Sequence, residues 1–310
     1  MPAGDTEVGF IGLGAMGSEI ASRLLEAGFP LAVFDTSRAR MEPFARRAAI
    51  CDSPAAVADR AETVFVSLPT PEAVREVVCG PDGLLAGGAI RTFGDLSTTG
   101  AGTARELAEK LSAAGISYLD APVSGGVAGA RAGSLGLFLA VEENLFERVE
   151  PMLNAFAGNV ISVGTQPGQG QLAKLLNNVL SATAMAATAE VLVIGVRAGL
   201  EAKVLLEAFN AGTGRNSATT SKFPDQILPR TFETGFRLEL MIKDLSLALE
   251  EGHAQGTPMI LAAAVSQVWA AAGASVGGEA DFSEIARLFE NWAGVELNDA
   301  GRPAHDTSKD

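Results

Sequence analysis

The sequence predicts an α/β domain with a mainly parallel sheet, then a long helix, then an all-helical domain. Up to about residue 165, short β-branched or apolar runs such as EVGFIGLG, PLAVFD and TVFVSLP alternate with helical patterns. Strands separated by helices of this length form parallel βαβ units. Beyond residue 165 helical runs dominate. We therefore predict one domain over residues 1–165, a helical domain over 166–298, and a polar, disordered tail over 299–310.

The predicted elements of the first domain follow one another in strand–helix order. Short apolar runs that end near Gly, Pro, Asp or Ser predict strands at 7–14, 30–35, 63–69, 89–97, 117–125, 134–141 and 159–164. Helical spacing of apolar residues predicts helices at 15–27, 40–48, 71–78 and 103–115. In the first of these helices, Met16, Ile20 and Leu24 share one face.

The second domain is predicted from longer helical runs. These runs lie at 168–195, 201–211, 238–251, 258–273 and 283–297, and the first of them is expected to link the two domains. Asp281 and Glu284 have the spacing of a capping box, which places a helix start at the last run.

Composition and charge exclude several classes of protein. A formal net charge of −14 disfavours a nucleic-acid partner, which requires a basic surface. The two cysteines, Cys51 and Cys79, have no CxxC partner, and His253 and His305 are the only histidines, so no metal site is expected. The N-terminus lacks the pattern of a signal peptide, and the run at 168–195 is interrupted by Lys, Asn and Glu. We expect a cytoplasmic protein that does not span a membrane.

A glycine pattern follows the first predicted strand. GFIGLGAMG carries G-x-G-x-x-G as Gly12, Gly14 and Gly17 and opens a predicted helix. These glycines would permit a tight turn, a close approach to a pyrophosphate and close packing of helix on strand, with the phosphates at the helix N-terminus. An ordinary strand–helix turn is the alternative. The context favours a Rossmann-type dinucleotide-binding domain, with contacts from Gly12, Leu13, Gly14, Ala15, Met16 and Gly17.

The end of the second predicted strand indicates which dinucleotide is bound. Asp35 follows the glycines by about 20 residues, where a carboxylate accepts hydrogen bonds from ribose hydroxyls and repels a 2′-phosphate. This favours NAD over NADP. Arg38 is close enough in sequence to leave NADP possible.

Four motifs in order carry a family resemblance. GFIGLGAMG, DAPVSGG at 120–126, GQGQLAKLLNN at 168–178 and MIKDLSLAL at 241–249 together resemble the 3-hydroxyisobutyrate dehydrogenase family, or β-hydroxyacid dehydrogenases. That group includes tartronate semialdehyde reductases. The resemblance extends over about residues 7–297 and implies a Rossmann-type domain, a long interdomain helix and an all-helical second domain.

The resemblance also implies roles for particular residues. The lysine that matches Lys174 is the family's acid/base, and the asparagine that matches Asn178 holds the substrate and orders the lysine. The loop that matches Ser124, Gly125 and Gly126 binds the substrate carboxylate, and Lys174 and Asn178 complete the substrate site. Residues near the cofactor match Leu68, Pro69, Thr98 and Lys243.

Elementary chemistry supports these roles. Lys174 and Asn178 are four residues apart and would share a helix face. Burial would lower the pKa of a lysine, which suits a group that both gives and takes a proton. The alternative is that Lys174 extends to solvent from the first turns of the helix. Consecutive backbone N–H groups and a serine hydroxyl can bind a carboxylate without a basic side chain.

Three functions remain open at this level. The first is oxidation of a small β-hydroxy acid by NAD, with Lys174 as the acid/base. The second is reduction of a semialdehyde, such as tartronate or succinate semialdehyde, with NADH or NADPH. The third is a non-catalytic dinucleotide-binding module. Apolar helices in the second domain favour a homodimer or homotetramer.

Overall fold

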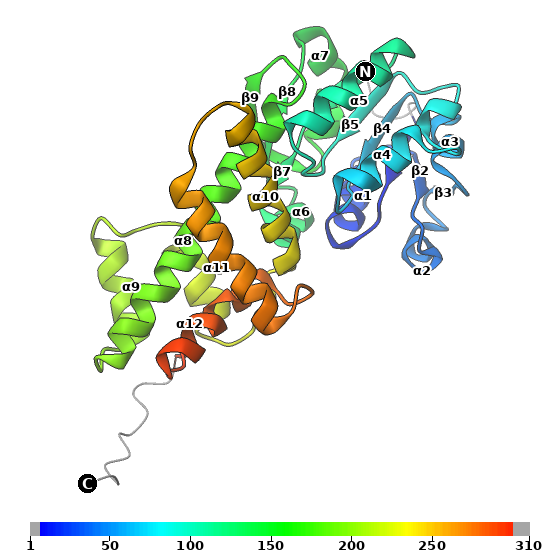
Figure 1. Ribbon diagram of the computed structural model, residues 1–310. Coiled ribbons are helices and arrows are strands. Elements are labelled where there is room, and N and C mark those ends of the chain that lie inside the picture. Colours follow the sequence, from blue (N-terminus) through cyan, green and yellow to red (C-terminus); the bar gives the residue numbers. More distant parts are fainter. Residues whose placement is uncertain (1–6, 300–310) are drawn as a thin grey trace, which may run out of the picture. The chain divides into compact units, whose positions relative to one another are not determined.

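The chain folds into two compact units, which divide between Leu176 and Asn177 (Figure 1). The computed structural model describes residues 7–299, and each unit is treated by itself below. The predicted tail at 299–310 lies outside the described residues except for Asp299.

Within the described residues, the first unit is built on one nine-stranded sheet. The strand order is β3-β2-β1-β4-β5-β6-β8-β7, with β9 paired to β8. Pairing is parallel except where β8 meets β6 and β7. The prediction of a mainly parallel sheet is confirmed. The strands are β1 (Val8–Ile11), β2 (Leu31–Phe34), β3 (Ala49–Ile50), β4 (Thr63–Val66), β5 (Thr92–Asp95), β6 (Ser117–Asp120), β7 (Val123–Ser124), β8 (Leu135–Ala140) and β9 (Ala157–Gly164).

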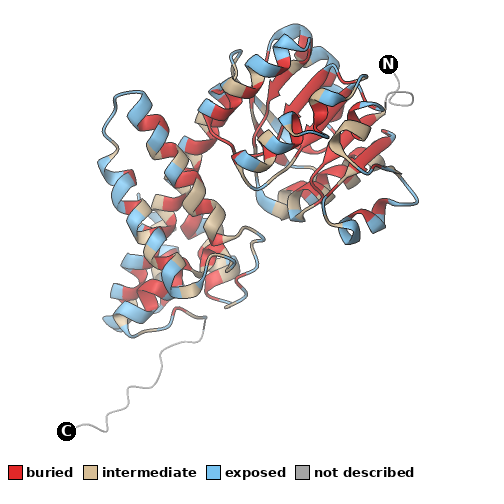
Figure 2. Ribbon diagram, turned by 45° about the vertical axis from the view of Figure 1, so that its right-hand side comes forward, coloured by how far each residue is buried: buried red, intermediate tan, exposed pale blue. Residues whose placement is uncertain are grey.

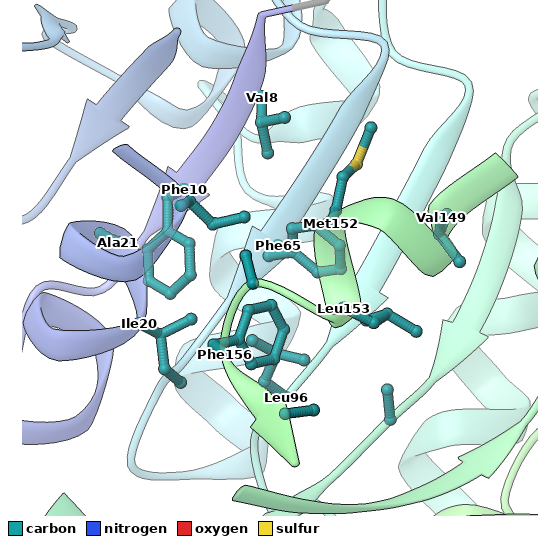
Figure 3. Close-up of a cluster of buried hydrophobic side chains, with 14 of the residues drawn as sticks. Val8, Phe10, Ile20, Ala21, Phe65, Leu96, Val149, Met152, Leu153 and Phe156 are labelled. Carbon is teal, nitrogen blue, oxygen red and sulfur yellow. The ribbon is translucent and has the colours of Figure 1, made fainter. Parts of the chain in front are cut away.

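Both faces of this sheet are covered, because successive residues of a strand point to opposite sides. Phe10 and Phe65 join one buried cluster with Ile20 and Phe156 (Figure 3). Ile11, Val64 and Val66 join a second cluster on the other side. The Phe65 and Phe156 rings meet edge to face at 6.1 Å between centroids. Continuous burial of the central strands is typical of a parallel sheet between two helical layers.

The helices of this unit divide between the two faces. Residues of α1, α6 and α7 belong to the first cluster, and residues of α3, α4 and α5 belong to the second. The helices are α1 (Ala15–Glu26), α2 (Arg38–Met41), α3 (Pro54–Ala58), α4 (Pro71–Cys79), α5 (Ala101–Ala113), α6 (Gly126–Ala132) and α7 (Glu143–Leu153), with short 3₁₀ turns at Glu42–Phe44 and Leu84–Ala86.

The second unit is helical within the described residues. Its elements are most of α8 (Gln169–Arg197), α9 (Ala202–Ala211), a π-helical segment (Ala218–Ile227), α10 (Leu238–Ala254), α11 (Ile260–Val276), a 3₁₀ turn (Phe282–Glu284) and α12 (Ile285–Ala293). Trp269 is fully buried, donates its indole N–H to the Ala182 carbonyl at 3.2 Å and stacks on Phe282. Trp292 is exposed, so only one of the two tryptophans is a core residue. Buried residues line the inner sides of these helices (Figure 2).

The capping box predicted at Asp281 and Glu284 is present in this unit. The Asp281 side chain accepts from the Ser283 backbone N–H, and the Glu284 side chain accepts from the Asp281 backbone N–H. The predicted capping box is therefore confirmed.

One helix of the described chain, α8, is long and apolar enough to cross a membrane by length and composition alone. A single such helix is weak support for a span, since core helices of soluble proteins have the same composition. Leu175, Met185 and Leu192 are buried in the two units, as in a core helix.

Candidate active site

The glycine turn after β1 has the geometry that a dinucleotide requires. Gly12 adopts a φ of +93°, and a Cβ there would lie 2.3 Å from the Ser67 carbonyl oxygen. A Cβ on Gly17 would lie 1.8 Å from the Gly12 oxygen, so only glycine lets the helix pack here. A Cβ on Gly14 would meet nothing within 4 Å. Helix α1 begins at Ala15 without a side-chain cap or an acidic residue in its first turn, which leaves its N–H groups open to an anion.

Asp35 joins the glycine turn to the end of β2. Its Oδ2 accepts the Leu13 backbone N–H at 2.7 Å, and its Oδ1 accepts the Ser37 backbone N–H at 2.8 Å. The nearest guanidinium group to this carboxylate, that of Arg40, is 3.8 Å away and largely exposed. Each carboxylate oxygen retains a second lone pair for a ribose hydroxyl. The residue thus both orders the turn and places a negative charge beside it.

The loops after β4 and β5 lie against each other. The Leu68 backbone N–H donates to the Ser97 hydroxyl at 3.0 Å, which ties the Leu68–Pro69 segment to the loop that carries Thr98. Leu68 and Thr98 are half-buried, and Pro69 is exposed. The Leu68 side chain would also be 2.8 Å from a Cβ on Gly12. The structure therefore brings these predicted cofactor residues together at the carboxyl ends of β1, β4 and β5, where ligands bind in open α/β sheets.

The segment after β6 contains the predicted carboxylate loop. Ser124 ends the short strand β7, which pairs with β8 through Gly136. Gly125 and Gly126 have φ values of +127° and +67°, which favour glycine, and both are exposed. This loop is reached only four residues after the buried end of β6 at Asp120.

Lys174 lies in the second turn of α8, in the first unit. It is only 8% exposed, so it does not extend to solvent as the alternative interpretation required. It follows Gln171 by three residues and Gly170 by four, so these three positions share one side of the helix.

Asn178 and Lys243 belong to the second unit, where Asp244 connects them. The Asn178 side-chain amide donates to Asp244 Oδ2 at 2.6 Å, and the Lys243 ammonium group is 3.0 Å from Asp244 Oδ1. Asn178 Oδ1 accepts from the Asn177 amide at 3.2 Å. Asp244 is 2% exposed. Because an ionised carboxylate only accepts, Asp244 fixes which end of the Asn178 amide faces it.

Several buried polar groups of the first unit were not predicted. Asp95 and Asp120 end adjacent strands in register, and both are fully buried. Asp95 accepts from the Ser97 backbone N–H, the Thr99 hydroxyl and the Tyr118 hydroxyl. The available signal was an acidic residue at the end of each apolar strand. Residues 7–299 contain no group of three or more His, Cys, Asp or Glu placed to hold a metal ion.

Burial changes the acidity of this pair. The pKa of the Asp120 carboxyl is raised from 3.8 to about 7, first by burial and then by the charge of Asp95. Burial likewise raises the pKa of Asp95, and burial together with these two carboxylates raises the pKa of Tyr118. At a pH between 3.8 and about 7, the Asp120 carboxyl of the folded protein therefore keeps a proton that the unfolded chain has released.

This difference predicts a pH-dependent stability. Between the ordinary pKa of 3.8 and the raised value of about 7, the native state binds more protons through Asp120, so the free energy of unfolding falls as pH rises. We expect Asp120→Asn to reduce the loss between about pH 5 and about pH 7 by on the order of 2 kcal/mol. Urea unfolding across this range measures it. Equal slopes for the two proteins would refute the assignment of a raised pKa to Asp120.

Comparisons with known proteins agree with this geometry. Residues 7–164 match the NAD binding domain of 6-phosphogluconate dehydrogenase, and residues 168–289 match the domain described as NAD-binding of NADP-dependent 3-hydroxyisobutyrate dehydrogenase. The 3-hydroxyisobutyrate dehydrogenase of Pseudomonas aeruginosa is 38% identical over 295 residues, covering 92% of this chain and 98% of that protein.

Two further similarities extend the comparison. The 2-(hydroxymethyl)glutarate dehydrogenase of Eubacterium barkeri is 34% identical over 294 residues, covering 94% of this chain and 97% of that protein. A structure of Mycobacterium tuberculosis 3-hydroxyisobutyrate dehydrogenase with L-serine has a TM-score of 0.82 at 32% identity, covering 91% of this chain and 98% of that one. The chain therefore belongs to the 3-hydroxyisobutyrate dehydrogenase family and is an NAD(P)-dependent oxidoreductase of hydroxy acids.

Proposed function

We propose that this chain oxidises small acids of the form HOCH₂–CH(R)–COO⁻ with NAD. The support comes from the compounds named with its relatives, which are 3-hydroxyisobutyrate, 2-(hydroxymethyl)glutarate and L-serine. Each carries a hydroxymethyl group on the carbon beside a carboxylate, and they differ only in R. A site that binds the alcohol and the carboxylate, and leaves room for R, accepts all three compounds.

The observation that carries the mechanism is the burial of Lys174 in the first turns of α8, at 8% exposure. As the neutral amine, it accepts the proton of the substrate hydroxyl while the hydride leaves the same carbon. In the reverse direction, its ammonium form donates a proton to the aldehyde oxygen. Asn178, one turn further along α8, holds the substrate oxygen and keeps the amine in place.

The carboxylate is bound by the loop Ser124–Gly126. The positive φ values of Gly125 and Gly126 support this role, because glycine lets successive backbone N–H groups face an anion. With a net charge of −14, the protein cannot rely on its overall field to attract an acid, so local donors are needed.

Residues 1–165 form the dinucleotide-binding domain in this proposal, and residues 166–298 form the all-helical one. Bound NAD supplies the hydride acceptor at its nicotinamide ring. The open N-terminus of α1 holds the pyrophosphate, and the Asp35 carboxylate selects a ribose without a 2′-phosphate. The proposed contacts are Gly12, Leu13, Gly14, Ala15, Met16, Gly17, Asp35, Leu68, Pro69, Thr98 and Lys243.

We further propose a soluble cytoplasmic homodimer or homotetramer without nucleic-acid or membrane partners. Large apolar side chains are exposed on the second unit, among them Leu180 at 73%, Ile194 at 64% and Ile260 at 82%. Burial of such side chains in a subunit interface would remove apolar surface from water. Light scattering on the purified protein gives the mass, and a monomer at every concentration would exclude this assembly.

The function is tested by a substrate panel. The panel contains 3-hydroxyisobutyrate, L-serine and 2-(hydroxymethyl)glutarate with NAD or NADP, and tartronate and succinate semialdehydes with NADH or NADPH. We expect turnover of at least one hydroxymethyl acid and a higher kcat/KM with NAD than with NADP. Better turnover with NADP would overturn the role of Asp35. Binding of NADH without any turnover would favour a non-catalytic module.

A further inference from the structure

We infer that Asp120 is a positioning residue for Lys174, because its buried carboxylate holds the first turn of α8 against the end of β6. The inference rests on the proposed function, in which Lys174 exchanges the proton. The Asp120 side chain does not need to touch the substrate. Its effect is to fix where the helix that carries the amine begins.

The contacts are those of a helix cap supplied from another strand. Asp120 Oδ2 accepts the backbone N–H groups of Gly168 at 2.8 Å, Gly170 at 2.9 Å and Gln171 at 3.4 Å. The first N–H groups of a helix have no hydrogen-bond partner inside the helix. Burial of such an N–H group is unfavourable unless another group accepts its hydrogen bond. The Asp120 carboxyl accepts these bonds in its protonated and its ionised form, and the ionised form also interacts favourably with the helix dipole. One side chain thus satisfies several donors 48 or more residues away.

Two glycines make this close approach possible. Gly168 has a φ of +95°, and a Cβ on it would lie 3.0 Å from Ala101. A Cβ on Gly170 would lie 2.5 Å from the Phe138 carbonyl oxygen and 2.8 Å from Asp120 Oδ1. The absence of a Cβ at Gly170 therefore leaves room for the carboxylate, and Gly168 supplies the positive φ and the close contact with Ala101.

Gln171 fastens the same turn to a second loop. Its Oε1 accepts the backbone N–H groups of Thr99 at 2.8 Å and Gly100 at 3.2 Å, and its Nε2 donates to the Ser97 carbonyl at 3.0 Å. Gln171 is fully buried. Because Thr98 lies within this loop, the start of α8 is held to a proposed cofactor segment as well.

Lys174 stands on the helix side that is held in this way. Gly170 and Gln171 precede it by four and three residues, which is one helical turn. Asp120 is also close in sequence to the proposed carboxylate loop, because Ser124 follows it by four residues. The Asp120 carboxylate therefore sets the position of the amine relative to the carboxylate loop. A misplacement of about 1 Å can reduce a reaction rate about 100-fold.

The test compares Asp120→Ala, Asp120→Asn, Lys174→Ala and a matched control, Asp281→Ala. Asp281 also caps a helix turn with its carboxylate, but in the second unit. The readouts are kcat for racemic 3-hydroxyisobutyrate per NADH-binding site, KM for NAD, and backbone amide exchange over residues 168–174. Counting sites by NADH titration removes the contribution of unfolded molecules.

We expect Asp120→Ala to lower kcat per site about 10- to 100-fold, with KM for NAD changed less than about twofold. Asn keeps an acceptor oxygen and is a good cap, so Asp120→Asn should retain kcat within about threefold. Amide exchange over 168–174 should rise in Asp120→Ala only. Asp281→Ala should lower the melting temperature and leave kcat per site unchanged.

Other results would overturn the inference. These are wild-type kcat in Asp120→Ala, equal loss in the Asn and Ala variants, or unchanged amide exchange at the start of α8. If Asp120→Ala does not fold, Gly170→Ala displaces the carboxylate by contact and should give the same loss of kcat. Amide exchange requires no turnover, so unchanged exchange would refute the inference even without a substrate. Full activity of Lys174→Ala would instead refute the acid/base assignment, while the cap at α8 could still be real.

Discussion

Replacement of Lys174 by alanine is expected to lower turnover by about two to four orders of magnitude. The reason is that the hydroxyl proton would have no acceptor at the moment when the hydride leaves. Binding of NADH should remain within about twofold of wild type, because the turn Gly12–Gly17 is unchanged. Steady-state kinetics on the hydroxymethyl acids and fluorescence titration with NADH measure the two effects separately.

Two further variants show whether proton transfer, rather than charge, is lost. Arginine keeps a positive charge but does not give up its proton near neutral pH, so Lys174→Arg should be as impaired as the alanine variant. Lys203→Ala removes an exposed lysine from α9 and should behave as wild type. An active Lys174→Arg enzyme would mean that the lysine acts only as a fixed charge.

Replacement of Gly14 by alanine is expected to reduce NADH affinity at least about tenfold without loss of stability. A Cβ at Gly14 meets nothing within 4 Å, and its backbone is extended with a φ of −68°, so the fold accepts alanine. The open space is where a pyrophosphate would approach the start of α1. Isothermal titration with NADH and thermal unfolding test the two halves of this prediction.

The neighbouring glycine provides the contrast. A Cβ on Gly17 would lie 1.8 Å from the Gly12 carbonyl oxygen, so Gly17→Ala should destabilise or unfold the protein. Gly14→Ala should not. Unchanged NADH affinity in Gly14→Ala would place the dinucleotide elsewhere.

Much of the fold could be predicted because its signals are local. Alternation of apolar strands and amphipathic helices indicates βαβ units, and the strands within residues 7–120 pair with one another in parallel. The capping box at Asp281 is likewise a property of four consecutive residues. The position of Lys174 in an apolar helix left burial and exposure open, and the family resemblance favoured the burial that the structure shows.

Other features depend on contacts between distant residues. β8 pairs antiparallel with β6 and β7, and it is connected to β7 through α6. The sequence of this connection does not indicate the direction of the strand that follows it. The π-helical segment at Ala218–Ile227 was not predicted, because it is rich in Thr and Ser and contains Pro224. Hydroxyl groups bond back to the backbone there, as Thr220 does to the Asn216 carbonyl.

The buried polar contacts within each unit were missed for the same reason. Asp120 contacts Gly168, Gln171 contacts Ser97, and Asp244 contacts Asn178, at separations of 48, 74 and 66 residues. A sequence pattern indicates that such residues end strands or start helices. It does not indicate which distant backbone groups they satisfy.

The most direct test of the central claim follows the hydride itself. Racemic 3-hydroxyisobutyrate with both hydrogens of the hydroxyl-bearing carbon replaced by deuterium is incubated with the protein and NAD, and the products are examined by mass spectrometry. The proposed reaction predicts one deuterium in the NADH that forms, an aldehyde at the former alcohol carbon, and an initial rate for both products that is about two to four orders of magnitude lower with Lys174→Ala. NADH without deuterium, or a wild-type initial rate from Lys174→Ala, would contradict it.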